Sequence, residues 1–209
     1  MNKKPIIAVD FNGALLKSRP FDEAHKNWFY LMSVLLKDNS IREYAGLENY
    51  FEKVNEVMKR YLGEVEEETR ITFARNLFSM TTIAEVRKDD LIKDFADYLE
   101  NIKKKYRLAL ITSAPENSVE PILKKLGCSN LFDILYKSPI GKHPDKMRLF
   151  EEFIREYEKP VYYIGAGDKD ILGCKKLGII TISVNWISKG KTKGDYNISR
   201  VKELEKIIE

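Results

Sequence analysis

Apolar positions along the chain follow two different periods, and the changes between them divide the sequence into three parts. Residues 5–10, PIIAVD, form an apolar run that ends on a carboxylate, as expected for a strand buried on both faces of a sheet. From about residue 21 to residue 100 the apolar positions recur at helical spacing. From Arg107 onward, short apolar runs alternate with helical segments. The pattern predicts an all-helical insert that interrupts an α/β unit directly after its first strand.

The helical insert carries apolar stripes that are rich in aromatic residues. Residues 23–36 place Trp28, Leu31, Met32 and Leu35 on one stripe, and residues 47–62 place Leu47, Phe51, Val54 and Met58 on another. Further helices are expected over residues 68–80 and 89–106. We interpret the stripes as packing between helices, with a substrate pocket beneath them as the alternative.

The C-terminal part predicts strands over 107–114, 131–137, 160–167 and 179–186, and helices over 115–127, 144–157, 168–178 and 198–208. Strands that alternate with helices imply right-handed crossovers and a parallel sheet. The expected fold class is therefore α/β, with a doubly wound parallel sheet and an all-helical cap. We place the core at residues 1–16 and 91–209 and the cap at residues 17–90, with residues 188–197 as the most linker-like loop.

Composition excludes several classes of protein. The chain has 209 residues, of which 44% are apolar and 33% charged, and this is typical of a globular domain. A net charge of only +4, with both signs interspersed, gives no signal for nucleic acid or for a membrane surface. The apolar run near the N-terminus is too short for a signal peptide, so a cytoplasmic location is expected. The two cysteines lack metal-ligand spacing.

Polar residues cluster at the predicted ends of the strands, where ligands bind in open α/β sheets. They are Asp10, Asn12, Gly13, Thr112, Ser113, Lys142, Asp168 and Asp170. Carboxylates are the ligands that Mg²⁺ prefers, and hydroxyl and ammonium groups bind phosphoryl oxygens. A carboxylate at a buried strand end is costly unless a metal or a donor compensates it. The strand ends therefore predict a site for Mg²⁺ and phosphate.

Four motifs in order resemble those of the haloacid dehalogenase-like hydrolase superfamily, most members of which are phosphatases. They are DFNGALL, LALITSA, GKHPDK and IGAGDKDILGCKKLG, which begin at residues 10, 108, 141 and 164. Each motif alone is a weak signal. Together they cover nearly the whole core, and the helical insert lies where the family carries its cap. The resemblance implies a small phosphorylated metabolite as substrate and a cap that closes over it; it leaves the oligomeric state open.

The resemblance also implies roles for individual residues. Asp10 would be the nucleophile that forms an aspartyl-phosphate, and Thr112 would hydrogen-bond the phosphoryl group, with Ser113 and Gly13 beside it. Asp170 would reach Mg²⁺ through water. Alternatively, the two hydroxyl residues could serve only as a helix cap or a strand-end turn.

The lysine of the third motif would neutralise the phosphoryl group and Asp10. We assign this role to Lys142, because it precedes the predicted helix. Lys146 and Lys137 fit the family spacing less well, and a solvated loop lysine is the alternative interpretation of Lys142.

Two departures from the family pattern bear on the chemistry. Asn12 stands where phosphatases of the family keep a second Asp, and an amide cannot serve as a general acid–base, although its backbone carbonyl could still bind the metal. Ala14 replaces the usual Thr. When Asp170 is aligned with the last Asp of the fourth motif, Ala166 stands where the first metal-binding Asp belongs. Asp168 could replace that acid, or it could simply cap a helix.

Three interpretations follow. The first is a weak or specialised Mg²⁺-dependent phosphatase that uses Asp10 without an efficient acid. The second is an inactive relative that binds a phosphorylated ligand or a protein. The third is a dehalogenase-type hydrolase, whose leaving group needs no proton. The retained acids and lysine favour phosphate over halide, and we favour the phosphatase.

Overall fold

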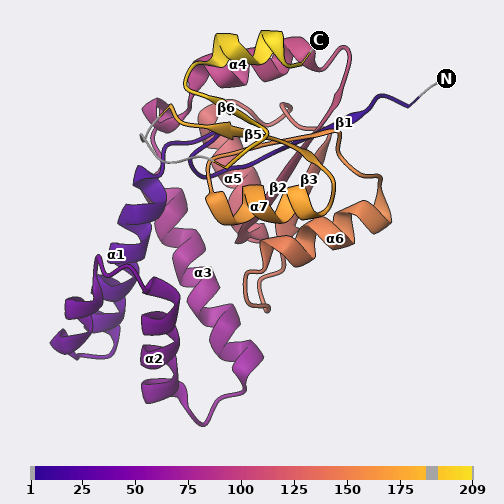
Figure 1. Cartoon of the computed structure of the whole chain (residues 1–209). Helices are drawn as coiled ribbons and strands as arrows, with labels where there is room; N and C mark the ends of the chain where they lie inside the picture. Colours follow the sequence, from indigo (N-terminus) through magenta and orange to yellow (C-terminus); the bar gives the residue numbers. More distant parts are fainter. Residues whose placement is uncertain (1–2, 187–192, 209) are drawn as a thin grey trace.

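A computed structural model of the chain describes residues 3–186 and 193–208, and it contains a six-stranded, all-parallel sheet (Figure 1). The strands are β1 (Ile6–Val9), β2 (Arg107–Pro115), β3 (Ile134–Ser138), β4 (Tyr162–Gly165), β5 (Ile180–Val184) and β6 (Tyr196–Ile198), in the order β3-β2-β1-β4-β5-β6. This order confirms the predicted doubly wound α/β fold. β1 lies between β2 and β4, so the residues that follow these three strands meet at one edge.

Helices cover both faces of the sheet because side chains alternate along β1. Ile7 and Val9 pack into the core cluster that includes residues of α4 (Lys93–Ile102) and α5 (Glu116–Leu126). Ile6 and Ala8 pack into the cluster of the opposite face, and Figure 1 shows its helices against the sheet. These helices are α6 (Lys146–Glu156) and α7 (Asp168–Lys176). With both faces covered, the strand is apolar throughout.

The segment between β1 and α4 forms a separate bundle below the sheet, which we call the helical unit (Figure 1). It comprises α1 (Arg19–Leu35), the 3₁₀ helix η1 (Asn39–Tyr44), α2 (Tyr50–Leu62) and α3 (Glu67–Glu85). It has its own core around Trp28, whose indole N–H donates to the carbonyl of Ala74 at 3.0 Å. Among the described residues, the helical unit thus has a core of its own beside the two clusters that cover the faces of the sheet.

The predicted stripes of the insert are only half correct. Trp28 and Met32 are buried, as are two members of the second stripe, Val54 and Met58. The other four members are exposed, and they are Leu31, Leu35, Leu47 and Phe51. Phe51 is 58% exposed because it borders a cavity rather than a neighbouring helix. The alternative of a pocket beneath the stripes therefore applies to part of the second one.

The C-terminal prediction is wrong in one respect. A helix was expected over residues 198–208, but Tyr196–Ile198 forms β6 and only Val201–Lys206 is helical, as the 3₁₀ helix η3. Ile198 pairs with Val184 of β5, so the sheet gains an edge strand before the chain turns back over it. The loop predicted at 188–197 lies partly outside the described residues.

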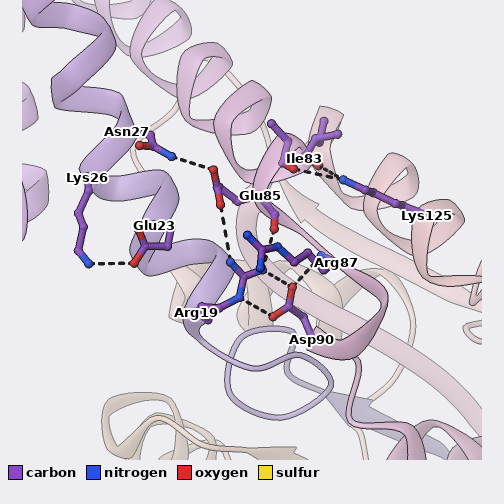
Figure 2. A network of polar contacts seen from close by, with 10 residues as sticks. Arg19, Glu23, Lys26, Asn27, Ile83, Glu85, Arg87, Asp90 and Lys125 are labelled. Carbon is purple, nitrogen blue, oxygen red and sulfur yellow. Dashed lines mark hydrogen bonds and ion pairs between the residues drawn. The ribbon is translucent and has the colours of Figure 1, made fainter.

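Two segments connect the helical unit to the sheet, and they run side by side. Leu16 and Leu91 form an antiparallel bridge, and the N–H of Lys17 donates to the carbonyl of Asp90 at 2.9 Å. Asp90 lies in η2 (Lys88–Asp90), where its buried carboxylate accepts hydrogen bonds from the guanidinium of Arg19 (Figure 2).

In the described part of the chain, no helix combines the length and apolarity that crossing a membrane requires.

Candidate active site

Three charged side chains meet where β1 and β4 end. Asp10 follows β1 directly and is only 6% exposed. Its carboxylate accepts a hydrogen bond from the ammonium of Lys146, which also donates to the hydroxyl of Tyr163 at 3.1 Å. The same ammonium lies 2.9 Å from a carboxylate oxygen of Asp170. One buried cation therefore bridges two carboxylates that come from opposite ends of the sequence.

The lysine at the site is Lys146 and not Lys142, so our preferred assignment was wrong. α6 begins at Lys146, one residue after its cap Asp145, and this places the first-turn side chain over the ends of the strands. Lys142 lies earlier in the loop, is exposed, and borders a neighbouring groove together with Glu152. Lys137 forms a surface ion pair with Glu120.

At this site, burial and the neighbouring charges shift the pKa values of Lys146 and Asp10 in opposite directions. Burial alone would lower the pKa of Lys146, but Asp10 and Asp170 outweigh it and hold that pKa above its usual value. Burial raises the pKa of Asp10, and the contact with Lys146 opposes this rise only in part. The lysine is therefore charged at neutral pH, and the site favours positive charge beside Asp10.

Asn12 and Gly13 form the turn that follows Asp10. Asn12 is exposed and borders the cavity next to Asp10. Gly13 adopts a left-handed conformation with φ of +79°, and a Cβ there would lie 2.9 Å from the Cβ of Ala166. A glycine is required for this turn to pack against the end of β4. The described contacts of Gly13 are with the protein backbone and do not place it in the cavity.

Thr112 and Ser113 lie on β2 beside Asp10 and border the cavity, as expected from the topology. Thr112 is buried, and its hydroxyl accepts a hydrogen bond from the N–H of Ala114 at 3.1 Å. That contact is the turn-capping role considered as the alternative. Because a hydroxyl can donate while it accepts, Thr112 remains able to contact a phosphoryl oxygen.

The two candidate acids of α7 differ in position. Asp170 borders the cavity and contacts Lys146. Asp168, the first residue of α7, is not among the residues that border the cavity and lies 3.9 Å from Lys193. The structure thus gives no support to Asp168 as a substitute for the missing acid at Ala166. Within the described residues, no group of three or more His, Cys, Asp or Glu side chains could hold a metal.

The charged residues lie at one end of a cavity of about 580 Å³ between the sheet and the helical unit. What we call the cavity floor consists of residues from the sheet, its adjoining helices and the loops between them: Asp10, Asn12, Thr112, Ser113, Ala114, Pro115, His143, Pro144, Lys146, Gly167, Lys169 and Asp170. What we call the cavity wall consists of residues from the helical unit: Phe21, His25, Tyr50, Phe51, Val54, Asn55, Ile71, Ala74, Arg75 and Phe78. The volume suits a small organic molecule.

Sequence reasoning missed two polar residues of the wall. His25 stacks between the rings of Tyr50 and Phe78, with centroid distances of 3.8 and 4.9 Å, and burial lowers its pKa to about 4. Arg75 is 8% exposed in the middle of α3. A signal for Arg75 does exist, because Ile71 and Phe78, four residues before it and three after, place it within an apolar stripe.

Comparison with known proteins identifies the family. The sequence model of the haloacid dehalogenase-like hydrolases matches residues 9–184. The chain belongs to this family. No curated protein matched the chain in a comparison of sequences.

Solved structures of haloacid dehalogenase-like proteins share the fold over nearly the whole chain. A predicted phosphatase from Clostridium acetobutylicum has a TM-score of 0.69 at 19% identity, with 99% of each chain covered. A predicted phosphoglycolate phosphatase from Haemophilus somnus has a TM-score of 0.65 at 18% identity, with 100% of each chain covered. A hydrolase of this type from Bacillus subtilis, crystallised with magnesium, has a TM-score of 0.63 at 15% identity, with 99% of each chain covered. At these identities the likeness concerns the fold.

Proposed function

We propose that the protein is a Mg²⁺-dependent phosphatase that hydrolyses small phosphomonoesters through an aspartyl-phosphate on Asp10. The observation that carries this proposal is the contact of one buried ammonium, that of Lys146, with both Asp10 and Asp170 on the floor of the cavity. The family contains hydrolases, and two of the similar structures are predicted phosphatases. In this proposal the helical unit is the cap that selects the substrate.

The donor set fits Mg²⁺ at its lower limit. Mg²⁺ commonly takes one or two carboxylates and keeps several waters. Asp10 and Asp170 both reach the same ammonium, so they lie close enough together to share one ion. Ala166 supplies no ligand, and the backbone carbonyl of Asn12 is the remaining candidate. When bound, the ion would neutralise charge on the phosphoryl oxygens.

The floor residues supply the first chemical step. A carboxylate oxygen of Asp10 attacks the phosphorus atom, and the bond between phosphorus and the leaving oxygen breaks, which leaves an aspartyl-phosphate and an alkoxide. Lys146 stabilises the negative charge that accumulates on the phosphoryl oxygens, and Thr112 donates to one of them. Water then attacks the aspartyl-phosphate, which releases inorganic phosphate and regenerates Asp10.

The leaving oxygen receives no proton from residue 12, because Asn12 is an amide. General acid–base help is worth about 10²–10⁴-fold in typical enzymes. Acidic alcohols, such as phenols, leave from their phosphate esters without that help. The expected substrates are therefore phosphate esters with good leaving groups.

The test compares p-nitrophenyl phosphate with an alkyl phosphate in the presence of Mg²⁺. We expect the wild type to hydrolyse the aryl ester, Asp10→Asn to abolish that activity, and Asn12→Asp to raise kcat/KM for the alkyl ester by about tenfold or more. Asn12→Asp alone is the sharper variant, since Asn12 is exposed, whereas Ala166→Asp would crowd the turn at Gly13.

Two outcomes would contradict the proposal. One is that the wild type releases no phosphate from either ester. The other is that Asp10→Asn retains full activity, which would remove the nucleophile from the mechanism. A thermal shift produced by beryllofluoride with Mg²⁺, in a protein without turnover, would identify a binding module of the same fold.

A further inference from the structure

Among the described residues, Arg75 of α3 is a buried cation that no carboxylate contacts directly. Its Nη2 atom donates to two backbone carbonyls, those of Ser113 at 3.4 Å and Ser138 at 3.3 Å. Its Nε atom is buried and has no hydrogen-bond partner among the described residues. No carboxylate in the described part of the chain hydrogen-bonds to Arg75, and Glu116 acts on it only through space. The donor capacity of this guanidinium is therefore only partly used.

Such a residue is unfavourable for folding alone. Burial of a charge is costly unless an opposite charge or a full set of hydrogen bonds compensates it. Burial lowers the pKa of Arg75 to about 10, so the group is still charged at neutral pH. Native proteins leave few buried polar groups unsatisfied, and those they leave often mark a site that a ligand completes.

The position of Arg75 indicates which ligand group it would meet. Its contact with the carbonyl of Ser113 places the guanidinium beside the end of β2, next to Thr112 of the floor. On the other side the wall is apolar and aromatic, and it includes Tyr50 and Phe78. A molecule whose phosphoryl group lies on the floor therefore has Arg75 and the aromatic rings as neighbours for its remaining atoms.

We propose that Arg75 selects phosphomonoesters whose leaving group joins a carboxylate to a planar apolar portion. The carboxylate accepts hydrogen bonds from the guanidinium, which binds planar anions with matching geometry. The apolar portion packs against the rings of the wall, of which that of Phe51 is 58% exposed. This inference rests on the proposed function, because the floor is assumed to hold the phosphoryl group.

The experiment measures kcat/KM for phenyl phosphate and for 3- and 4-carboxyphenyl phosphate in the wild type and in Arg75→Gln. Each substrate is compared with itself in the two proteins, so that its intrinsic reactivity cancels. We expect Arg75→Gln to lower kcat/KM by about 10- to 100-fold for the better carboxylated ester, which is the effect of one charge-assisted hydrogen bond. For phenyl phosphate the loss should be at least about fivefold smaller than for that ester, because no contact with a carboxylate is lost.

Matched variants separate ligand binding from a structural role. Arg70 lies on the same helix and donates to backbone carbonyls, including that of Leu62, but it is not among the residues that border the cavity. Arg70→Gln should leave the ratio between the substrates unchanged. Arg75→Lys retains the charge and should recover part of the preference. An equal loss on all esters, or no loss on any, would overturn the proposal.

A binding measurement keeps the test independent of turnover. Benzylphosphonate and 4-carboxybenzylphosphonate are not hydrolysed, and calorimetry gives their Kd in the wild type and in Arg75→Gln. We expect the wild type to bind the carboxylated compound about tenfold more tightly, and the variant to bind the two equally. If no ester is hydrolysed but this preference holds, the proposed function fails and the role of Arg75 stands. If the preference is absent in the wild type, the role of Arg75 is excluded.

Discussion

The floor and the wall of the cavity differ in whether their buried cations are paired with carboxylates. On the floor, Lys146 is satisfied by two carboxylates and a hydroxyl, although it is almost fully buried. In the wall, Arg75 has no carboxylate partner among the described residues, and burial keeps His25 neutral. The ammonium of Lys146 is thus paired before a substrate arrives, whereas the guanidinium of Arg75 is left for the substrate to pair with.

In the proposed function, this difference separates the floor, which carries out the reaction, from the wall, which selects the substrate. Groups that act on the phosphoryl group have to be held in place beforehand, and ion pairs and strand ends hold them. Groups that distinguish one leaving group from another gain specificity if they stay unsatisfied until the correct ligand binds, because a wrong ligand leaves a buried polar group unpaired. The predictions that follow test whether floor, connection and wall behave as separable parts.

The largest expected effect is on the floor. Lys146→Met removes the cation that contacts Asp10, and we expect kcat for p-nitrophenyl phosphate to fall by about 10²–10³-fold, the usual effect of losing one stabilising group at a transition state. Steady-state kinetics measure it, with circular dichroism to confirm that the variant is folded.

Lys142→Met is the matched control for this variant, because Lys142 lies in the same loop–helix segment but faces a neighbouring groove. It should change kcat by less than about twofold, as surface substitutions away from the site usually do. A large loss in Lys142→Met with full activity in Lys146→Met would show that the loop rearranges when substrate binds, and that the sequence-based assignment was correct.

The second effect concerns the connection between floor and wall. Asp90 is 1% exposed and accepts hydrogen bonds from Nε of Arg19 at 2.9 Å and from the N–H of Arg87 at 2.7 Å. Burial alone would raise the pKa of Asp90, but these bonds outweigh it and hold the pKa below its usual value. Arg19→Met should lower the free energy of unfolding by about 2 kcal/mol, since it leaves a buried carboxylate without its cation.

The pH dependence of this pair has a definite sign. Because the pKa of Asp90 is lower in the folded protein, its contribution is present above about pH 4, the unfolded value, and is lost as the pH falls through the folded value. Urea titrations at pH 7 and pH 3 should therefore differ less for Arg19→Met than for the wild type. Lys93→Met, which breaks an exposed pair with Asp97, is the control and should cost less than about 0.5 kcal/mol.

Much of the floor could be predicted from the sequence because topology determines it. Once parallel strands alternate with helices, residues at or just after the C-terminal ends of β1, β2 and β4 must meet at one edge, and Asp10, Thr112 and Asp170 do so. The lysine was misassigned because a helix start is uncertain by a few residues in sequence. Lys142 lies in the loop four residues before Lys146, the first residue of α6, and only Lys146 borders the cavity.

The wall could not be predicted in the same way. Its residues come from α1, α2 and α3, and which faces of these helices point to the cavity depends on how they pack together. An apolar stripe looks the same whether it faces a helix or a ligand, so Val54 and Phe51 were grouped together although both border the cavity and only Phe51 is exposed. A polar residue within a stripe, such as Arg75, distinguishes the two cases.

The smallest expected effect is in the wall itself and tests its apolar character. Burial lowers the pKa of His25 to about 4, whereas an unfolded histidine titrates near about 6.5. As the pH falls below about 6.5, His25 becomes protonated in the unfolded chain but stays neutral in the folded protein. The free energy of unfolding therefore decreases between about pH 6.5 and pH 4. Since His25 is partly exposed, we expect a loss of only about 1–2 kcal/mol between pH 7 and pH 5.

His25→Phe retains a flat ring between Tyr50 and Phe78 but cannot take up a proton. It should remove most of that pH dependence, as measured by urea unfolding at pH 7, 6 and 5. If His25→Phe keeps the full slope, the ring is solvated in the folded protein. The wall would then be a polar surface, and its contrast with the floor would disappear.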